Sequence, residues 1–115
     1  MIYQFILYAS DQQRSRDFYR TVLQKEPSLD VPGMTEFDLN DKVKLGLMPE
    51  NGISKIICPL LPHPALAKGI PRCELYIFGT DVKICMDRAL AAGAILISEA
   101  AARDWGHFAG YVADL

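Results

Sequence analysis

The chain has 115 residues, of which 50% are apolar and 23% are charged, and its formal net charge is -2. This length suits one domain with a core of its own, and the composition excludes a disordered or low-complexity protein. The sequence has no basic patch of the kind that follows a phosphate backbone, so we expect no nucleic-acid partner.

The N-terminal run and the cysteines indicate the compartment. The apolar run 2–9 is much too short to span a bilayer and has no basic segment before it, which favours a strand over a signal peptide or a membrane anchor. The three cysteines, Cys58, Cys73 and Cys85, match no zinc motif. We therefore expect reduced thiols in a cytoplasmic protein that has no membrane partner.

A strand and a helix open the chain. Residues 3–9 are rich in aromatic and β-branched side chains, which predicts a strand. Ser10 is followed three residues later by Gln13, a capping-box pattern that marks a helix start. Apolar side chains at helical spacing then predict a helix over residues 11–24.

The same order returns in the second half of the chain. Residues 73–78 are predicted to form a strand, Thr80 is a suitable N-cap, and the apolar spacing predicts a helix over 81–92. Gly93 follows the helix, where a glycine in the left-handed conformation often ends one. Asp11 and Asp81 occupy matching places in the two halves, which indicates a weak internal repeat.

A hairpin is predicted after each helix. Residues 34–39 and 43–48 are separated by an Asn-Asp pair that suits a tight turn. Residues 94–98 and 108–113 are predicted strands joined by a loop over 100–106. We therefore predict an α+β fold of two βαβββ-type modules that form one curved mixed sheet, with the helices on one face.

We treat residues 1–115 as one domain with module 1 at about 1–48, a linker at 49–72 and module 2 at about 73–115. The linker holds five of the seven prolines, which excludes a central strand and a helix interior at those positions. A loop of this length is either a lid or wall of a site or a plain crossover between the modules, and both interpretations stay open.

Both modules carry an ordered set of short motifs. They are Leu7-Tyr8-Ala9-Ser10-Asp11, Ser15-Arg16-Asp17-Phe18-Tyr19 and Leu23, then Glu74-Leu75-Tyr76-Ile77-Phe78, Ala91-Ala92-Gly93-Ala94, Asp104-Trp105-Gly106 and Tyr111-Val112-Ala113-Asp114. This set resembles the glyoxalase / bleomycin resistance protein / extradiol dioxygenase superfamily, the vicinal oxygen chelate proteins. In that family a last strand follows the position of Asp114, so we expect it to be absent from these 115 residues.

The resemblance implies four metal-ligand positions on the concave face of the sheet. They align with Gln4, with Gly46, which has no side chain, with Glu74, and with a fourth position beyond Leu115. Gln4 and Glu74 are thus the candidate metal ligands, and Glu74 is the candidate catalytic base. Two oxygen donors suit Mg²⁺, Ca²⁺ or Mn²⁺ and are few for a tight site, so we expect no cofactor or a weakly held divalent metal.

The remaining candidate residues follow from strand alternation, which places Gln4, Ile6 and Tyr8 on one face. Together they would line a mostly apolar, aromatic cavity for a small molecule. The candidate ligand-binding residues are Gln4, Ile6, Tyr8, Lys44, Met48, Tyr76, Phe78 and Trp105. The carboxylates of Glu36, Asp38 and Glu74 would attract a cationic ligand, and the lone loop histidines His63 and His107 are expected to be surface residues.

Two classes of function are compatible with these residues. The first is a protein that binds a small organic ligand in the concave cavity without a complete metal site, for which Gly46 is the main argument. The alternative is a metal-dependent lyase, isomerase or dioxygenase similar to lactoylglutathione lyase, and the sequence does not decide whether any reaction is catalysed. The apolar linker and the aromatic face predict a homodimer.

Overall fold

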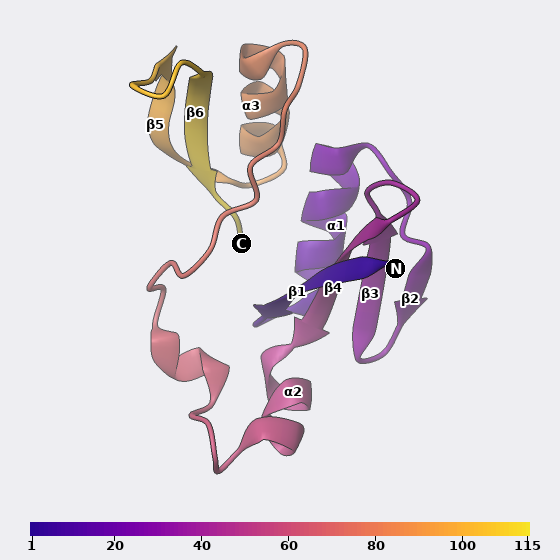
Figure 1. The fold of residues 1–115 in the computed structure, drawn as a ribbon. Helices are drawn as coiled ribbons and strands as arrows, with labels where there is room; N and C mark the ends of the chain where they lie inside the picture. Colours follow the sequence, from indigo (N-terminus) through magenta and orange to yellow (C-terminus); the bar gives the residue numbers. More distant parts are fainter.

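The structure, a computed structural model, describes all 115 residues and has an α+β fold with two sheets (Figure 1). The α+β class predicted from the sequence is confirmed. In chain order the elements are β1 (Tyr3–Ala9), α1 (Gln12–Leu23), β2 (Leu29–Val31), β3 (Met34–Asp38), β4 (Val43–Pro49), α2 (Glu50–Ile57), the 3₁₀ helix η1 (Pro64–Ala67), α3 (Val82–Ala91), β5 (Ile95–Ala102) and β6 (Phe108–Ala113). No helix has the length and apolar character needed to cross a membrane.

Module 1 forms a four-stranded mixed sheet in the order β1-β4-β3-β2. Strand β1 runs parallel to β4, whereas β4, β3 and β2 are antiparallel neighbours. The predicted hairpin is confirmed, and the Asn40 side chain closes its turn by accepting the N–H groups of Lys42 and Val43. Strand β2 was missed because three residues between two prolines are too short to show an alternating pattern.

The core of module 1 lies between α1 and one face of this sheet. Phe18 and Tyr19 from the helix pack against Phe37, Leu45 and Leu47 from the strands, and all five side chains are buried. Burying each large apolar side chain stabilises the fold by about 1.5–3 kcal/mol. The strand alternation that the sequence predicted therefore decides which face of the sheet is core and which remains open.

Both main helices agree with the prediction to within one residue at each end, but their caps differ from it. The carboxylate of Asp11 accepts the N–H of Arg14 at 3.1 Å, and that of Asp81 accepts the N–H of Ile84 at 3.1 Å. The N-caps are thus the two repeated aspartates, and the predicted caps Ser10 and Thr80 each lie one residue too early. Gly93 has φ +111°, as expected for the glycine that follows α3.

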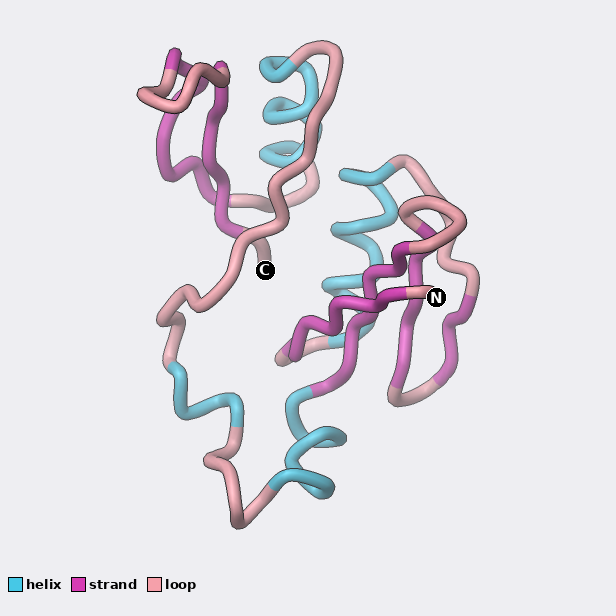
Figure 2. The backbone as a smooth tube through the Cα atoms, viewed as in Figure 1, coloured by secondary structure: helices cyan, strands magenta, loops and turns pink.

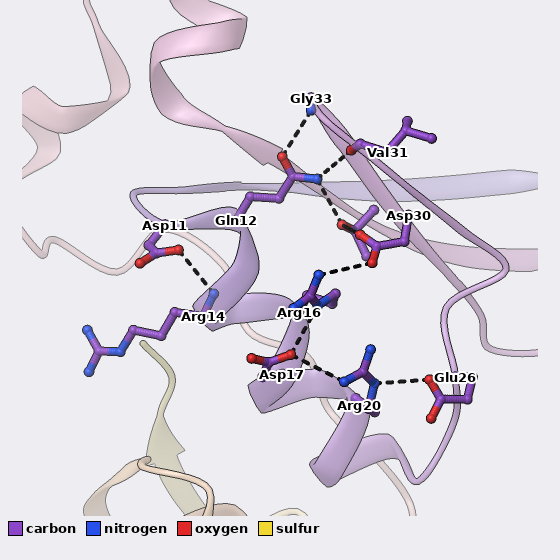
Figure 3. A network of polar contacts seen from close by, with 11 residues as sticks. Asp11, Gln12, Arg14, Arg16, Asp17, Arg20, Glu26, Asp30, Val31 and Gly33 are labelled. Carbon is purple, nitrogen blue, oxygen red and sulfur yellow. Dashed lines mark hydrogen bonds and ion pairs between the residues drawn. The ribbon is translucent and has the colours of Figure 1, made fainter.

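A single side chain ties the start of α1 to the β2–β3 hairpin (Figure 3). The amide nitrogen of Gln12 donates to the carbonyl oxygen of Val31 at 2.8 Å and to the hydroxyl of Thr35 at 2.9 Å. Its amide oxygen accepts the N–H of Gly33 at 3.0 Å. Further along α1, Arg16 pairs with Asp30 on β2, so the hairpin is held to the helix by polar contacts as well as by the core.

Module 2 does not continue the sheet of module 1, which corrects the prediction of one curved sheet. Strands β5 and β6 form a separate antiparallel pair covered by α3. Residues 73–78 are extended but form no strand, and residues 71–80 make no backbone–backbone hydrogen bond. A β-type pattern needs a neighbouring strand to become a strand, and none lies beside this segment.

The hairpin of module 2 also differs in part from the prediction. Strand β6 has the predicted bounds, whereas β5 runs to Ala102 and shifts register at Leu96/Ser98 and at Ser98/Ala101. The predicted loop over 100–106 is therefore shortened to residues 103–107. An alanine-rich end with an irregular register shows no alternation that sequence reasoning can detect.

The linker is partly helical, which the sequence prediction missed. Helix α2 ends before Pro59, and Pro64 stands in the first turn of η1, so the prolines bound these helices without interrupting them. Ile53 of α2 is buried, but Ile56 is 74% exposed and Leu60 is 94% exposed. The backbone trace shows α2 and η1 leading into a long loop before α3 (Figure 2).

The two modules meet through α1, α3 and the end of the chain. Ala92, Ala94 and Leu115 pack against the core of module 1, and the hydroxyl of the buried Tyr19 is hydrogen-bonded to the carboxylate of Asp114. Burial, together with this hydrogen bond, raises the pKa of Tyr19. The tyrosine therefore stays a neutral donor that joins the helix of module 1 to the segment after β6.

Candidate functional site

The first candidate site is the face of the module 1 sheet that α1 does not cover. In the register of the sheet, Gln4 lies beside Lys44, and Gly46 lies between Ile6 and Glu36. Side chains of directly paired residues point to the same face of a sheet. Gln4, Ile6, Lys44, Gly46 and Glu36 therefore share this open face, and the predicted alternation along β1 is confirmed.

Four polar side chains on this face form what we call the open-face network: Gln4, Glu36, Asp38 and Lys44. The amide nitrogen of Gln4 donates to Glu36 at 3.0 Å, and the ammonium of Lys44 lies 3.7 Å from Glu36 and 3.3 Å from Asp38. Two carboxylates face one ammonium, so the network has a net charge of -1. Glu36 is mostly buried, with 19% of its side chain exposed, so this charge is only partly screened by solvent.

Gly46 lies directly beneath the side chain of Gln4. A β-carbon at position 46 would be 2.5 Å from the Gln4 amide nitrogen and 3.1 Å from Cγ1 of Ile6. The predicted closeness of Gln4 and Gly46 is confirmed. The missing side chain thus gives Gln4 the space to reach Glu36 across the central strand.

The predicted metal ligands do not come together. Glu74 is exposed in the extended segment outside both sheets, so it shares no sheet face with Gln4 and the prediction on this point is wrong. Gln4 turns an N–H donor toward Glu36, and Lys44 already pairs with both carboxylates. No group of three or more His, Cys, Asp or Glu side chains is arranged to hold a metal. These residues do not fit a divalent metal ion.

The second candidate site is an aromatic cluster in module 2, formed by Tyr76, Phe78, Trp105 and His107. The Tyr76 ring centroid lies 5.2 Å from that of Phe78 and 5.7 Å from that of His107, and the Phe78 and His107 rings meet edge to face at 5.2 Å. The indole N–H of Trp105 donates to the Tyr76 hydroxyl at 3.0 Å, and this hydroxyl is 2.8 Å from Nδ1 of His107. Three of the four are predicted ligand residues.

His107 is the member of this cluster that sequence reasoning missed. It is exposed, as expected of a loop histidine, but it is not isolated. The available signal was its spacing, because Trp105 and His107 flank Gly106, whose φ of +92° allows a tight turn. Such a turn brings both rings toward Tyr76.

Arg103 holds the loop that carries two of these rings. Its guanidinium donates to the carbonyl oxygens of Ala109 and Glu99 and to the hydroxyl of Ser98, at 2.8–3.1 Å. It also lies over the ring of Tyr111, 5.2 Å from the centroid. The backbone N–H of Arg103 donates to the His107 carbonyl at 2.8 Å, so the loop is fixed from both ends.

The predicted ligand residues therefore form two sets, one in each module. On module 1, Ile6 is 40% exposed and Tyr8 is 48% exposed, while Lys44 and Met48 are half-buried. No hydrogen bond joins these residues to the aromatic cluster. Two surface hollows, of about 410 Å³ and about 270 Å³, lie along α1, and none of the predicted ligand residues lines them.

The fold of this chain is similar to those of solved glyoxalase, bleomycin resistance and dioxygenase proteins. A glyoxalase-related enzyme from Fulvimarina pelagi has a TM-score of 0.77 over 99% of this chain and 80% of that chain, at 21% identity. A glyoxalase/bleomycin resistance protein/dioxygenase family enzyme from Burkholderia phytofirmans PsJN has a TM-score of 0.68 over 96% and 87% of the two chains, at 18% identity. The resemblance predicted from the motifs is thereby confirmed for the fold.

Lactoylglutathione lyase from Agrobacterium tumefaciens is also similar, with a TM-score of 0.63 over 99% of this chain and 85% of that chain, at 22% identity. The sequence itself matches no protein-family model and no curated protein. At these identities the likeness establishes the fold, and the function has to be argued from the sites.

Proposed function

We propose that the protein binds a small organic ligand on the open face of module 1, without a resident metal. The observation that carries this proposal is the open-face network, in which Lys44 takes the place that a metal ion would need between the carboxylates of Glu36 and Asp38. The polar network can orient a ligand, and the exposed side chains of Ile6 and Tyr8 beside it can supply apolar contact. This combination is the usual composition of a small-molecule site.

A ligand screen with matched variants tests this proposal. The purified chain is screened by ligand-observed NMR against a library of small aromatic and cationic compounds. We expect Lys44→Ala to weaken the uncharged aromatic hits about tenfold or more, because it removes the ammonium that holds Glu36 and Asp38 in place and leaves the two carboxylates to repel each other. The control is Lys42→Ala, an exposed lysine on the neighbouring turn that forms no ion pair. Equal binding by wild type and Lys44→Ala would contradict the proposed site.

Metal analysis decides between this proposal and the alternative. The likeness to lactoylglutathione lyase is the observation that favours a metal-dependent lyase, isomerase or dioxygenase. We expect substoichiometric zinc, nickel and iron after purification without chelators. One equivalent of any of these metals would favour the enzyme and contradict a metal-free binding protein.

We further propose that the chain works as a homodimer in the cytoplasm. The accessible surface is 8141 Å², whereas a compact monomer of this mass exposes about 6,300 Å². The excess of about 1,900 Å² per chain is in the range that obligate dimers bury. All three cysteines are free, which agrees with a reducing compartment.

A further inference from the structure

The aromatic cluster of module 2 is exposed. Phe78 is 75% exposed, Trp105 is 54% exposed and Tyr76 is 39% exposed. Aromatic rings that contact one another and remain open to solvent are unusual in a monomer and mark surfaces that bind. The question is which chemistry would fit on these rings.

The hydrogen bonds within the cluster set the state of His107. Trp105 has only a donor, so the Tyr76 oxygen accepts its N–H. The Tyr76 hydroxyl hydrogen then needs an acceptor, and Nδ1 of His107 is the one within reach, at 2.8 Å. The opposite arrangement would leave this hydrogen without an acceptor in the cluster. With the Tyr76 hydrogen donated to Nδ1, the arrangement that joins all three groups within the cluster, a neutral His107 has its hydrogen on Nε2.

Nε2 of His107 is accordingly a hydrogen-bond donor with no partner in the protein, since the ring is bonded through Nδ1 alone. Arg103 and the tight turn at Gly106 fix the loop around it. A donor held in one place beside exposed rings is a directional binding group, because a site with few polar groups uses them to orient its ligand.

The packing of the rings limits the shape of the ligand. Tyr76, Phe78 and His107 are in mutual contact, with centroids 5.2–5.7 Å apart. A quaternary ammonium group needs to lie within about 6 Å of several ring faces that surround it, and rings already in contact leave no such space. The outer faces are still available, and these accept a flat ring by offset stacking.

We propose that the aromatic cluster binds a planar aromatic ligand that carries an oxygen acceptor, with the ring stacked on Phe78 and the oxygen accepting Nε2–H of His107. This proposal goes beyond the proposed function, because it assigns a binding surface in module 2 with its own class of ligand and adds His107 to the binding residues. Trp105 and Tyr76 act as positioning residues that hold the imidazole in one tautomer.

Fluorescence of the full chain tests the proposal with benzamide as the probe. Trp105 is the only tryptophan, so its emission reports directly on the cluster. We expect a saturable change with benzamide and responses at least tenfold weaker with cyclohexanecarboxamide, which lacks the aromatic ring, and with benzylamine, which lacks the oxygen acceptor. His107→Phe keeps a ring and removes the donor, and should weaken benzamide binding at least tenfold, whereas Lys42→Ala should bind as wild type does.

Two further measurements keep the test decisive if His107→Phe does not fold. Nitrogen NMR of the wild-type imidazole should show the tautomer protonated on Nε2, and the tautomer protonated on Nδ1 would overturn the proposal. Absence of a saturable benzamide response in the wild type would also overturn it and leave the cluster as an anchor for residues 73–78. Loss of binding in Lys44→Ala with full binding in His107→Phe would place the ligand on the open face, so that the proposed function stands and this inference fails.

Discussion

Gln12 shows how one side chain can set the position of a hairpin. Its amide group uses two donor bonds and one acceptor bond on Val31, Thr35 and Gly33, and Thr35 is fully buried. We expect Gln12→Ala to lower the free energy of unfolding by about 1–3 kcal/mol, because it removes three hydrogen bonds, one of them to the hydroxyl of the buried Thr35. The control is the exposed neighbour Gln13→Ala, and urea denaturation of both variants measures the difference. Equal midpoints would contradict this role.

Individual site residues differ in how well the sequence could predict them. Gln4 and Gly46 were placed together correctly by the family resemblance, and strand alternation, a local rule, gave the face on which Gln4 lies. Glu74 and His107 were not, since their surroundings depend on whether residues 73–78 find a strand partner and on the conformation of a loop. The residues that sequence reasoning placed well are those held by a continuous sheet.

At the scale of an element, the two matching aspartates explain why the helices begin where they do. Asp11 and Asp81 each accept an N–H three residues ahead, so each satisfies a group that the first helical turn leaves free. We expect Asp11→Ala and Asp81→Ala each to lower the free energy of unfolding by about 1 kcal/mol. Ser10→Ala and Thr80→Ala are the matched controls and should change it little. Thermal unfolding followed by circular dichroism measures all four, and a larger loss in the controls would restore the originally predicted caps.

The other elements show where a sequence pattern predicts the structure and where it does not. The helices α1 and α3 were predicted to within one residue because an apolar stripe and a cap signal act within one segment. Helix α2 was missed because the prolines around it suggested a loop, although they stand outside it. Residues 73–78 have the composition of a strand but no neighbour, so their pattern is not sufficient to form one.

The whole molecule is more open than a single domain of its size. Its radius of gyration is 15.0 Å, whereas a compact chain of this length has about 13 Å. Figure 1 shows α2, η1 and the loops beside them extending away from both sheets. The two modules meet mainly through their helices. The sequence predicted two modules, but not that their sheets stay separate, because the relative placement of modules depends on surfaces that no local pattern encodes.

This open shape leads to the prediction of a homodimer. Strand β1 pairs with β4 on one side only, and its side chains Phe5 (66% exposed) and Tyr8 (48% exposed) meet solvent. A second copy would cover such an edge and bury the excess surface, which a monomer otherwise leaves open to aggregation.

Light scattering at micromolar concentration should give about twice the chain mass of 12.8 kDa. Phe5→Glu should shift the protein toward monomer, because it places a charge in the interface, while Lys42→Glu on the polar turn should not. A monomer mass that stays unchanged on concentration would mean that the single chain tolerates its exposed apolar surface, and would contradict the dimer.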